Sequence, residues 1–131
     1  MPFTRITLLK GRSPEELKAI SDSFHQALVE TFDTPATDKF QAFHQLERGE
    51  LVFDRDYFSR GRSDGFVVFQ VTTGKPRSAG TKRAFYRRAV ELLGQAPGIR
   101  PQDVMIIVNA AGGEDWSFSD GEAQMAPADA A

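Results

Sequence analysis

Hydrophobic and polar positions in the first third of the chain predict a strand, a helix and a second strand. Residues 3–9 alternate loosely and are rich in β-forming side chains, which is typical of a strand. Ser13, Pro14 and Glu16 form a helix start, with a capping serine, proline in the first turn and glutamate three residues after the cap. An apolar stripe then predicts a helix over residues 14–31, and residues 40–46 form the next strand candidate. The stripe consists of Leu17, Ile20, Phe24, Leu28 and Phe32.

The same order of elements recurs later in the chain. Residues 66–72 are the most strand-like run, residues 79–94 carry a helical apolar pattern, and residues 104–108 form a closing buried strand. The pair Arg12-Ser13 opens the first helix and Arg77-Ser78 opens the second. We therefore predict a duplicated β-α-β unit, with halves at about 2–46 and 66–109.

The segments outside these halves are more polar. Between the halves we predict a turn at residues 47–49, a short strand at Leu51–Phe53 and a loop over residues 54–65. The tail from residue 119 is rich in Ala, Gly and Asp and has little to bury. We expect one domain over residues 1–118 and a tail, 119–131, that is flexible or packs on another subunit.

A β-α-β crossover makes its two strands parallel. The predicted fold class is therefore α/β (α+β): a four-stranded mixed sheet with two helices on one face. If the first strands of the two halves pair antiparallel, three sites meet at one edge of the sheet. These are Pro2, the pair Asp38-Lys39 and the turn Lys75-Pro76-Arg77.

The strongest strand also predicts self-association. Val67, Phe69 and Val71 alternate with Phe66, Val68 and Gln70, so both faces of the sheet are expected to be apolar. Helices cover one face, and a lone protomer would leave the other in water. We expect a homo-oligomer.

The composition of the chain disfavours or excludes several classes of function. The chain has 131 residues, enough for one modest core, and 40% of them are hydrophobic. Sixteen basic residues against 18 acidic ones leave a net charge of −2, so no strong field favours nucleic acid or an anionic membrane. Without cysteine, thiol catalysis is excluded. Short apolar runs predict neither a membrane span nor a signal peptide, and we expect a soluble cytoplasmic protein.

The convergent residues suit acid–base chemistry at an amine. Removal of Met1 before a small residue would leave Pro2 as a free secondary amine, and an unperturbed α-amino group titrates at about 7.7–8.0. A nearby carboxylate such as Asp38 raises that pKa, whereas burial and cations lower it. Arg77 and Lys75 would bind a substrate carboxylate, the arginine in bidentate geometry.

These residues resemble the tautomerase superfamily, and within it the malonate semialdehyde decarboxylases. The resemblance rests on Pro2, the duplicated unit, the basic turn and six further stretches in the same order along the chain. They are Gly11-Arg12, residues 32–41, His44-Gln45, residues 71–78, Lys82 with residues 84–87, and residues 115–118.

The resemblance implies a trimer and a decarboxylase that needs neither cofactor nor metal. In that family Pro2, Asp38 and Arg77 match catalytic residues, while Trp116 and Phe118 match aromatic residues that line the pocket. The substrate would be malonate semialdehyde or a similar 3-oxo acid. Lys75 stands where the family has a second arginine, in a turn that Gly74 lengthens. Lysine keeps the charge and loses the planar fork, so this departure bears on the substrate.

Other functions stay open at this point. A keto–enol tautomerase of 2-oxo acids such as phenylenolpyruvate would use neutral Pro2 as a base, and a haloacrylate dehalogenase or hydratase would use Asp38 to activate water. A non-enzymatic, ligand-binding trimer would need no free amine.

The remaining polar candidates are interpreted as structural. We expect His25 to be a surface or boundary residue, His44 to be a hydrogen-bonded strand residue, and Glu114 with Asp115 to cap a turn.

Overall fold

The computed structural model describes residues 1–128 as one β-α-β unit followed by a second. Strand β1 (Phe3–Leu9) leads through α1 (Pro14–Thr31) to β2 (Phe40–Leu46). After a long connector, β3 (Val67–Thr73), α2 (Ala79–Gln95) and β4 (Val104–Ala110) repeat the pattern, with short 3-10 turns at Pro101–Asp103 and Gly113–Asp115. The predicted elements of the two halves are thus present, and the last two strands are shifted or extended by one or two residues.

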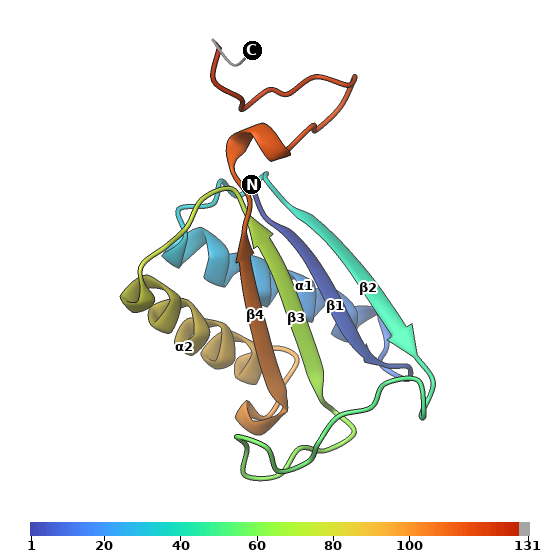
Figure 1. The fold of residues 1–131 in the computed structure, drawn as a ribbon. Helices are drawn as coiled ribbons and strands as arrows, with labels where there is room; N and C mark the ends of the chain where they lie inside the picture. Colours follow the sequence, from blue (N-terminus) through green and yellow to red (C-terminus); the bar gives the residue numbers. More distant parts are fainter. Residues whose placement is uncertain (129–131) are drawn as a thin grey trace.

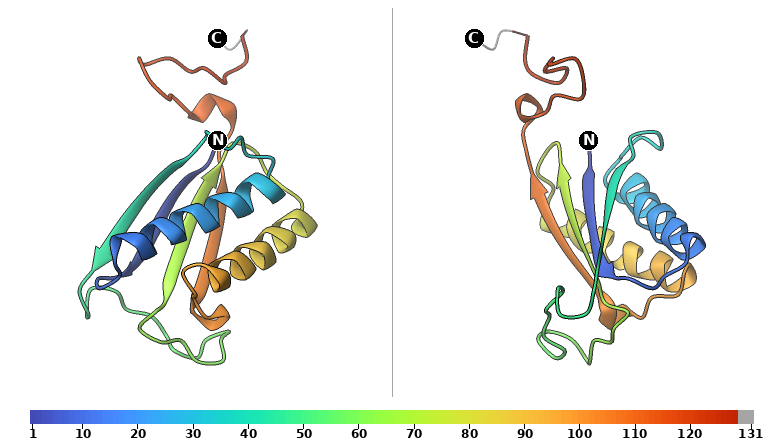
Figure 2. Two further views of the ribbon diagram at one scale, coloured as in Figure 1. Left: turned by 180° about the vertical axis from the view of Figure 1, so that it is seen from behind. Right: turned by 90° about the vertical axis from the view of Figure 1, so that its right-hand side faces the viewer.

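The four strands form one mixed sheet in the order β2-β1-β3-β4. β1 runs parallel to β2 and β3 parallel to β4, while β1 and β3 pair antiparallel at the centre. Both helices lie on the same face, which Figure 2 shows from behind and from the side. This architecture confirms the predicted fold class, including the antiparallel pairing of the two halves.

Helix starts follow the capping signals in the sequence. Ser13 Oγ accepts a hydrogen bond from the backbone N–H of Glu16 at 3.1 Å, and the Glu16 carboxylate accepts one from Ser13 N–H at 3.1 Å. This reciprocal box satisfies two amides that have no partner within the helix. Ser78 caps α2 in the same way by accepting from Thr81 N–H at 3.1 Å.

The core lies between the sheet and the two helices. Phe24 of α1 stacks on Phe69 of β3 with ring centroids 4.3 Å apart and meets Phe85 of α2 edge-on at 5.4 Å. All three side chains are fully buried, so each contributes roughly 1.5–3 kcal/mol of hydrophobic stabilisation. The periodic apolar positions of the sequence therefore form this core.

The other face of the sheet is mixed rather than uniformly apolar. The strand register places Val68 beside Met105 and Gln70 beside Ile107, while Arg5 pairs with Gln70 across β1 and β3. The expectation of an apolar outer face is therefore only partly right, because Arg5 and Thr7 of β1 and Gln70 of β3 interrupt it. A hollow of about 440 Å³ lies on the apolar part, between these strands and the connector.

The connector differs from its prediction in one place. Leu51–Phe53 does not form a strand; Leu51 makes a single bridge with Arg48. Val52 is 87% exposed, whereas Phe53 turns inward and stacks on Phe66 at 4.4 Å. The apolar run thus covers the lower end of the open sheet face instead of pairing with an edge. Residues 54–65 form the expected loop.

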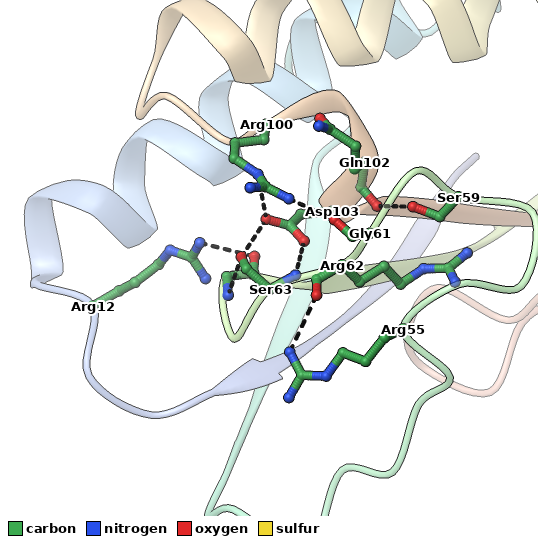
Figure 3. Close-up of polar contacts among 10 residues, drawn as sticks. Arg12, Arg55, Ser59, Gly61, Arg62, Ser63, Arg100, Gln102 and Asp103 are labelled. Carbon is green, nitrogen blue, oxygen red and sulfur yellow. Dashed lines mark hydrogen bonds and ion pairs between the residues drawn. The ribbon is translucent and has the colours of Figure 1, made fainter.

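A buried carboxylate fastens this loop to the sheet at the lower end of Figure 1. Asp103 is 2% exposed and accepts hydrogen bonds from Ser63 N–H at 2.7 Å and Ser63 Oγ at 2.6 Å. Arg100 pairs with it at 3.4 Å, and Arg12 donates to Gly65 O at 3.0 Å. Figure 3 shows this convergence of the turn between β1 and α1, the loop and the segment that leads into β4.

The tail beyond β4 rises from the opposite end of the sheet (Figure 1). Phe118 N–H donates to the Gln124 side chain at 3.0 Å, and Gln124 donates back to Ser119 O at 3.0 Å. Residues 129–131 of the predicted tail lie outside the described residues, and the domain boundary at residue 118 stays a prediction. Within residues 1–128, neither helix carries an apolar stretch long enough to span a bilayer.

Asp103→Ala is expected to lower the free energy of unfolding by about 2–3 kcal/mol, because it leaves buried donors of Ser63 without an acceptor. Urea denaturation followed by circular dichroism measures this loss. Glu122→Ala, an exposed acid in the tail, serves as the control and should change stability by less than about 0.5 kcal/mol. Equal stability of the two variants would contradict the anchoring role of Asp103.

Candidate active site

The amino end of β1, the approach to β2 and the exit of β3 meet at the upper edge of the sheet in Figure 1. Phe3 pairs with Phe40 on one side and with Thr72 on the other. This register follows from the two crossovers and the central antiparallel pair, and it brings the chain start close to residues 36–40 and 73–77.

An ion pair joins the amino terminus to Asp38. The ammonium of Met1 lies 2.7 Å from Asp38 Oδ2, and both side chains are largely buried, at 17% and 19% exposure. Pro2, the next residue, is buried. The predicted proximity of Asp38 to the chain start is therefore present, with Met1 as the immediate partner of the carboxylate.

Met1 also covers Gly74 in the turn after β3. A β-carbon on Gly74 would overlap Cε of Met1, so a larger residue here would displace the flexible Met1 side chain. Gly74, the residue that lengthens this turn, therefore lies against Met1 and places the turn beside the amino terminus. Sequence reasoning noted Gly74 only as an insertion, because its contact with Met1 depends on tertiary structure.

The basic turn itself is held firmly. Thr73 Oγ1 donates to Lys75 O at 3.1 Å, and Arg77 donates to the same carbonyl at 2.8 Å. Thr73 is 2% exposed and was not anticipated as a site residue, since a threonine at the end of a strand carries no distinctive signal. These bonds fix the backbone from which the Lys75 side chain projects.

Arg77 points toward the end of α1. Its guanidinium donates to Phe32 O at 2.9 Å and lies over the Phe32 ring at 4.6 Å. Partial burial lowers the pKa of Arg77, and the nearby Asp33 carboxylate opposes that effect. In this arrangement Arg77 secures the turn to α1, and its donors face backbone carbonyls.

Lys75 differs from Arg77 in its surroundings. Its side chain is exposed, and no ion pair or side-chain hydrogen bond within residues 1–128 involves its ammonium. It is the cation of this turn whose charge is available to a ligand.

The aromatic candidates lie on the segment after β4. Trp116 and Phe118 stack with centroids 5.6 Å apart and planes 10° from parallel. Phe118 lies 6.4 Å from Phe40, the first residue of β2 and only two positions after Asp38. Trp116 Nε1 is buried without a hydrogen-bond partner among the described residues. The pair therefore forms an apolar wall that reaches the segment carrying Asp38.

The structure revises both histidine expectations. His25 is 8% exposed, and its Nε2 lies 2.9 Å from Ala36 O, so it is a buried residue rather than a surface one. His44 is exposed on the open face of the sheet, where no side-chain hydrogen bond to it is present in residues 1–128. Asp115 does cap a turn, as expected, by accepting from Gly112 N–H at 2.9 Å.

No group of three metal-ligating side chains occurs in the part of the chain that the structure describes. The site thus consists of an amino terminus, a carboxylate, a cationic turn and an aromatic wall. Such a set can move protons at an amine and hold a small carboxylate-bearing molecule.

Comparisons with known proteins agree with this arrangement. A family model described as tautomerase enzyme matches residues 38–119, and another with the same description matches residues 2–60. The chain is 35% identical over 125 residues to "Probable tautomerase YusQ" of Bacillus subtilis (strain 168), covering 95% of this chain and 98% of that protein. "Probable tautomerase YrdN" of the same organism is 34% identical over 124 residues, covering 95% of each chain.

Solved structures give the same picture. Malonate semialdehyde decarboxylase, determined in wild-type, mutant and inactivated forms, superposes with a TM-score of 0.88 at 32% identity, covering 94% of this chain and 95% of that one. A malonate semialdehyde decarboxylase inhibited by 3-bromopropiolate gives a TM-score of 0.86 at 33% identity, covering 93% and 92%. The matches span the whole sheet, both helices and the site, and this chain belongs to the tautomerase family of enzymes.

Proposed function

We propose that this enzyme is a cofactor-independent decarboxylase of malonate semialdehyde or a similar 3-oxo acid, with Pro2 as its amino-terminal amine. The observation that carries the proposal is the 2.7 Å ion pair between the amino terminus and Asp38. A carboxylate at this distance stabilises an ammonium, and a cationic Pro2 is the form that polarises a carbonyl. The two decarboxylases that share this fold at 32% and 33% identity support the same reaction class.

Removal of Met1 prepares the site in this proposal. It transfers the chain's free amine to Pro2 and takes away the side chain that covers Gly74. Asp38 loses the Met1 ammonium and faces the new secondary amine, which lies one residue along the chain. A small substrate then enters beside Pro2, between the turn at Gly74 and the segment that carries Asp38.

The reaction follows from the charges at the site. The cationic Pro2 donates a hydrogen bond to the aldehyde oxygen. In the alternative route Pro2 first gives up its proton, its neutral nitrogen adds to the aldehyde carbon, and the protonated hydroxyl leaves as water to form an iminium. The bond between the carboxylate carbon and the α-carbon then breaks, and its electron pair moves toward the polarised carbonyl or iminium as carbon dioxide leaves. The α-carbon of the resulting enol or enamine takes up a proton, and in the iminium route water releases the aldehyde.

In this proposal, the turn after β3 and the aromatic wall orient the substrate. Lys75 binds the departing carboxylate, and Arg77 shares this role once its guanidinium turns from Phe32 O. Trp116 and Phe118 present apolar rings, which disfavour the charged carboxylate relative to neutral carbon dioxide.

Keto–enol tautomerisation of 2-oxo acids such as phenylenolpyruvate is the second candidate. The two Bacillus subtilis relatives, each called a probable tautomerase, favour it. That reaction needs neutral Pro2 as a base, and a pKa of Pro2 below the ordinary range of about 7.7–8.0 would indicate it. Dehalogenation or hydration of a haloacrylate ranks lower, because it needs an acid that activates water, and Asp38 is the one good candidate that the site offers among the described residues.

Purified enzyme is expected to release carbon dioxide from malonate semialdehyde faster than it ketonises phenylenolpyruvate. Pro2→Ala should lower kcat/KM for decarboxylation at least about 100-fold, because it removes the cyclic secondary amine that acts in proton transfer. Coupled detection of the aldehyde product measures the rate. Alanine also permits removal of Met1, and intact mass confirms that both proteins begin at the second residue. Faster tautomerisation, or turnover that survives Pro2→Ala, would contradict the proposal.

Lys75→Met should raise KM roughly 10-fold or more by removing a charge-assisted contact to the substrate, with little change in the free energy of unfolding. Arg77→Met should lower that free energy by about 1–2 kcal/mol, because Phe32 O loses its side-chain donor and Lys75 O keeps only Thr73 Oγ1. Steady-state kinetics and urea denaturation separate the two effects. Arg87→Met, an exposed change on α2, is the control. An unchanged KM in Lys75→Met would place this lysine outside the substrate site.

We also propose that the enzyme is a homotrimer, with the open sheet faces turned toward one another. Met105→Glu should shift the protein toward monomer, because Met105 is 41% exposed on the apolar part of that face. Arg83→Glu, on the exposed side of α2, should leave the assembly unchanged. Analytical ultracentrifugation at micromolar concentration measures both. A wild-type protein that sediments as a stable monomer would refute the trimer.

A further inference from the structure

Asp38 lies in a segment without regular secondary structure. Residues 32–39 connect α1 to β2. Phe32 N–H and Thr34 N–H donate to Leu28 O at 2.9 and 3.4 Å, so the start of the segment is held on α1 by its backbone. Further along, the backbone bonds are local turns, Asp38 N–H to Pro35 O at 3.0 Å and Lys39 N–H to Thr37 O at 3.1 Å. Around Asp38 the contacts to α1 are therefore made by side chains.

Three of these contacts come from one stretch of α1. His25 Nε2 lies 2.9 Å from Ala36 O, Lys39 Nζ lies 2.8 Å from the Asp22 carboxylate, and Gln41 Nε2 lies 3.1 Å from Ser21 O. Asp38 falls between the residues that are held. Helix α1 thus contacts the chain on both sides of Asp38.

These three contacts differ in strength. The Asp22 side chain is 51% exposed, and it is shared between Lys18 and Lys39, whose hydrogen bonds lower the pKa of Asp22. Exposed ion pairs contribute little. The His25 contact is part-buried, because the imidazole is 8% exposed while Ala36 lies at the surface, and losing it would leave the Ala36 carbonyl without that donor.

The chemistry of this contact fixes the proton on the imidazole. A carbonyl oxygen only accepts hydrogen bonds, so Nε2 of His25 carries the proton and donates it to Ala36 O. His25 is therefore a fixed donor to the backbone two residues before Asp38.

We propose that His25 is a positioning residue for the active site: it holds the segment at Ala36 so that the Asp38 carboxylate stays against the amino-terminal amine. This inference rests on the proposed role of Pro2 and Asp38. It assigns His25 no contact with substrate. Besides Asp38, the charged side chains on the segments that meet at this edge are Asp33 and Lys39 between α1 and β2, and Lys75 and Arg77 after β3.

The test follows protonation of Pro2 directly, in mature enzyme labelled with ¹⁵N-proline, by NMR titration. Asp38→Asn should move the titration midpoint to lower pH, because the ammonium loses its carboxylate. His25→Leu should move it in the same direction by a smaller amount, since the carboxylate remains but is less well held. His25→Gln, which keeps a donor at a similar reach, should restore the wild-type midpoint.

Two comparisons separate positioning from general destabilisation. In the double variant His25→Leu with Asp38→Asn, the midpoint should equal that of Asp38→Asn alone, because His25 acts only through the carboxylate. Ser23→Ala is the matched control: Ser23 is also buried on α1, but its hydroxyl donates to Ala96 O at 2.6 Å, beyond α2. Ser23→Ala should lower thermal stability and leave the midpoint unchanged.

An unchanged midpoint in His25→Leu, or an equal change in Ser23→Ala, would overturn the proposal. If leucine prevents folding, His25→Asn provides the same comparison, because its amide is too short to reach Ala36 O and remains polar. The titration does not depend on which substrate is turned over. Failure of the decarboxylase assay with a shifted midpoint would therefore refute the proposed reaction and leave the role of His25 intact.

Discussion

The antiparallel pairing of β1 with β3 is the interaction on which the rest of the structure depends. Each β-α-β half has parallel strands, and only this central ladder joins the halves into one sheet. Because the ladder is antiparallel, the start of β1 lies beside the end of β3, and the parallel partner of β1 also starts there. Chain start, carboxylate segment and cationic turn meet at this edge for that reason.

A carboxylate of low exposure lies at each end of the sheet, and the two carboxylates differ in their partners. At one end Asp103 is almost fully enclosed and satisfied by Ser63 and Arg100, which suits an anchor for a long connector. At the other end Asp38 has a single strong partner, the amino terminus, and keeps some exposure. A carboxylate with one charged partner near solvent can exchange that partner for a ligand or a different amine, whereas a fully satisfied one cannot.

Periodicity and capping signals predicted the helices and strands because those elements are determined locally and by a single buried stripe. Ser13 and Ser78 marked the helix starts, and the topology then located Asp38 at the same edge as the chain start.

The sequence-based expectations that the structure corrects have a common cause. Leu51–Phe53 looks like a strand, but its phenylalanine packs on Phe66 across the connector. His25 looks like a boundary residue, but the segment after α1 folds back over it, and Arg77 turns to Phe32 O. Each outcome depends on contacts between residues that are not neighbours in the sequence, and the pattern of hydrophobic and polar positions does not predict such contacts.

The contact between Met1 and Gly74 bears on how this protein is handled and how it matures. Any extension at the amino end, whether a retained methionine or an affinity tag, locks the proline nitrogen into an amide and crowds the glycine beneath it. In the proposed mechanism, the enzyme therefore becomes active only once Met1 has been removed, and a purification handle placed ahead of Met1 would leave it folded and inactive.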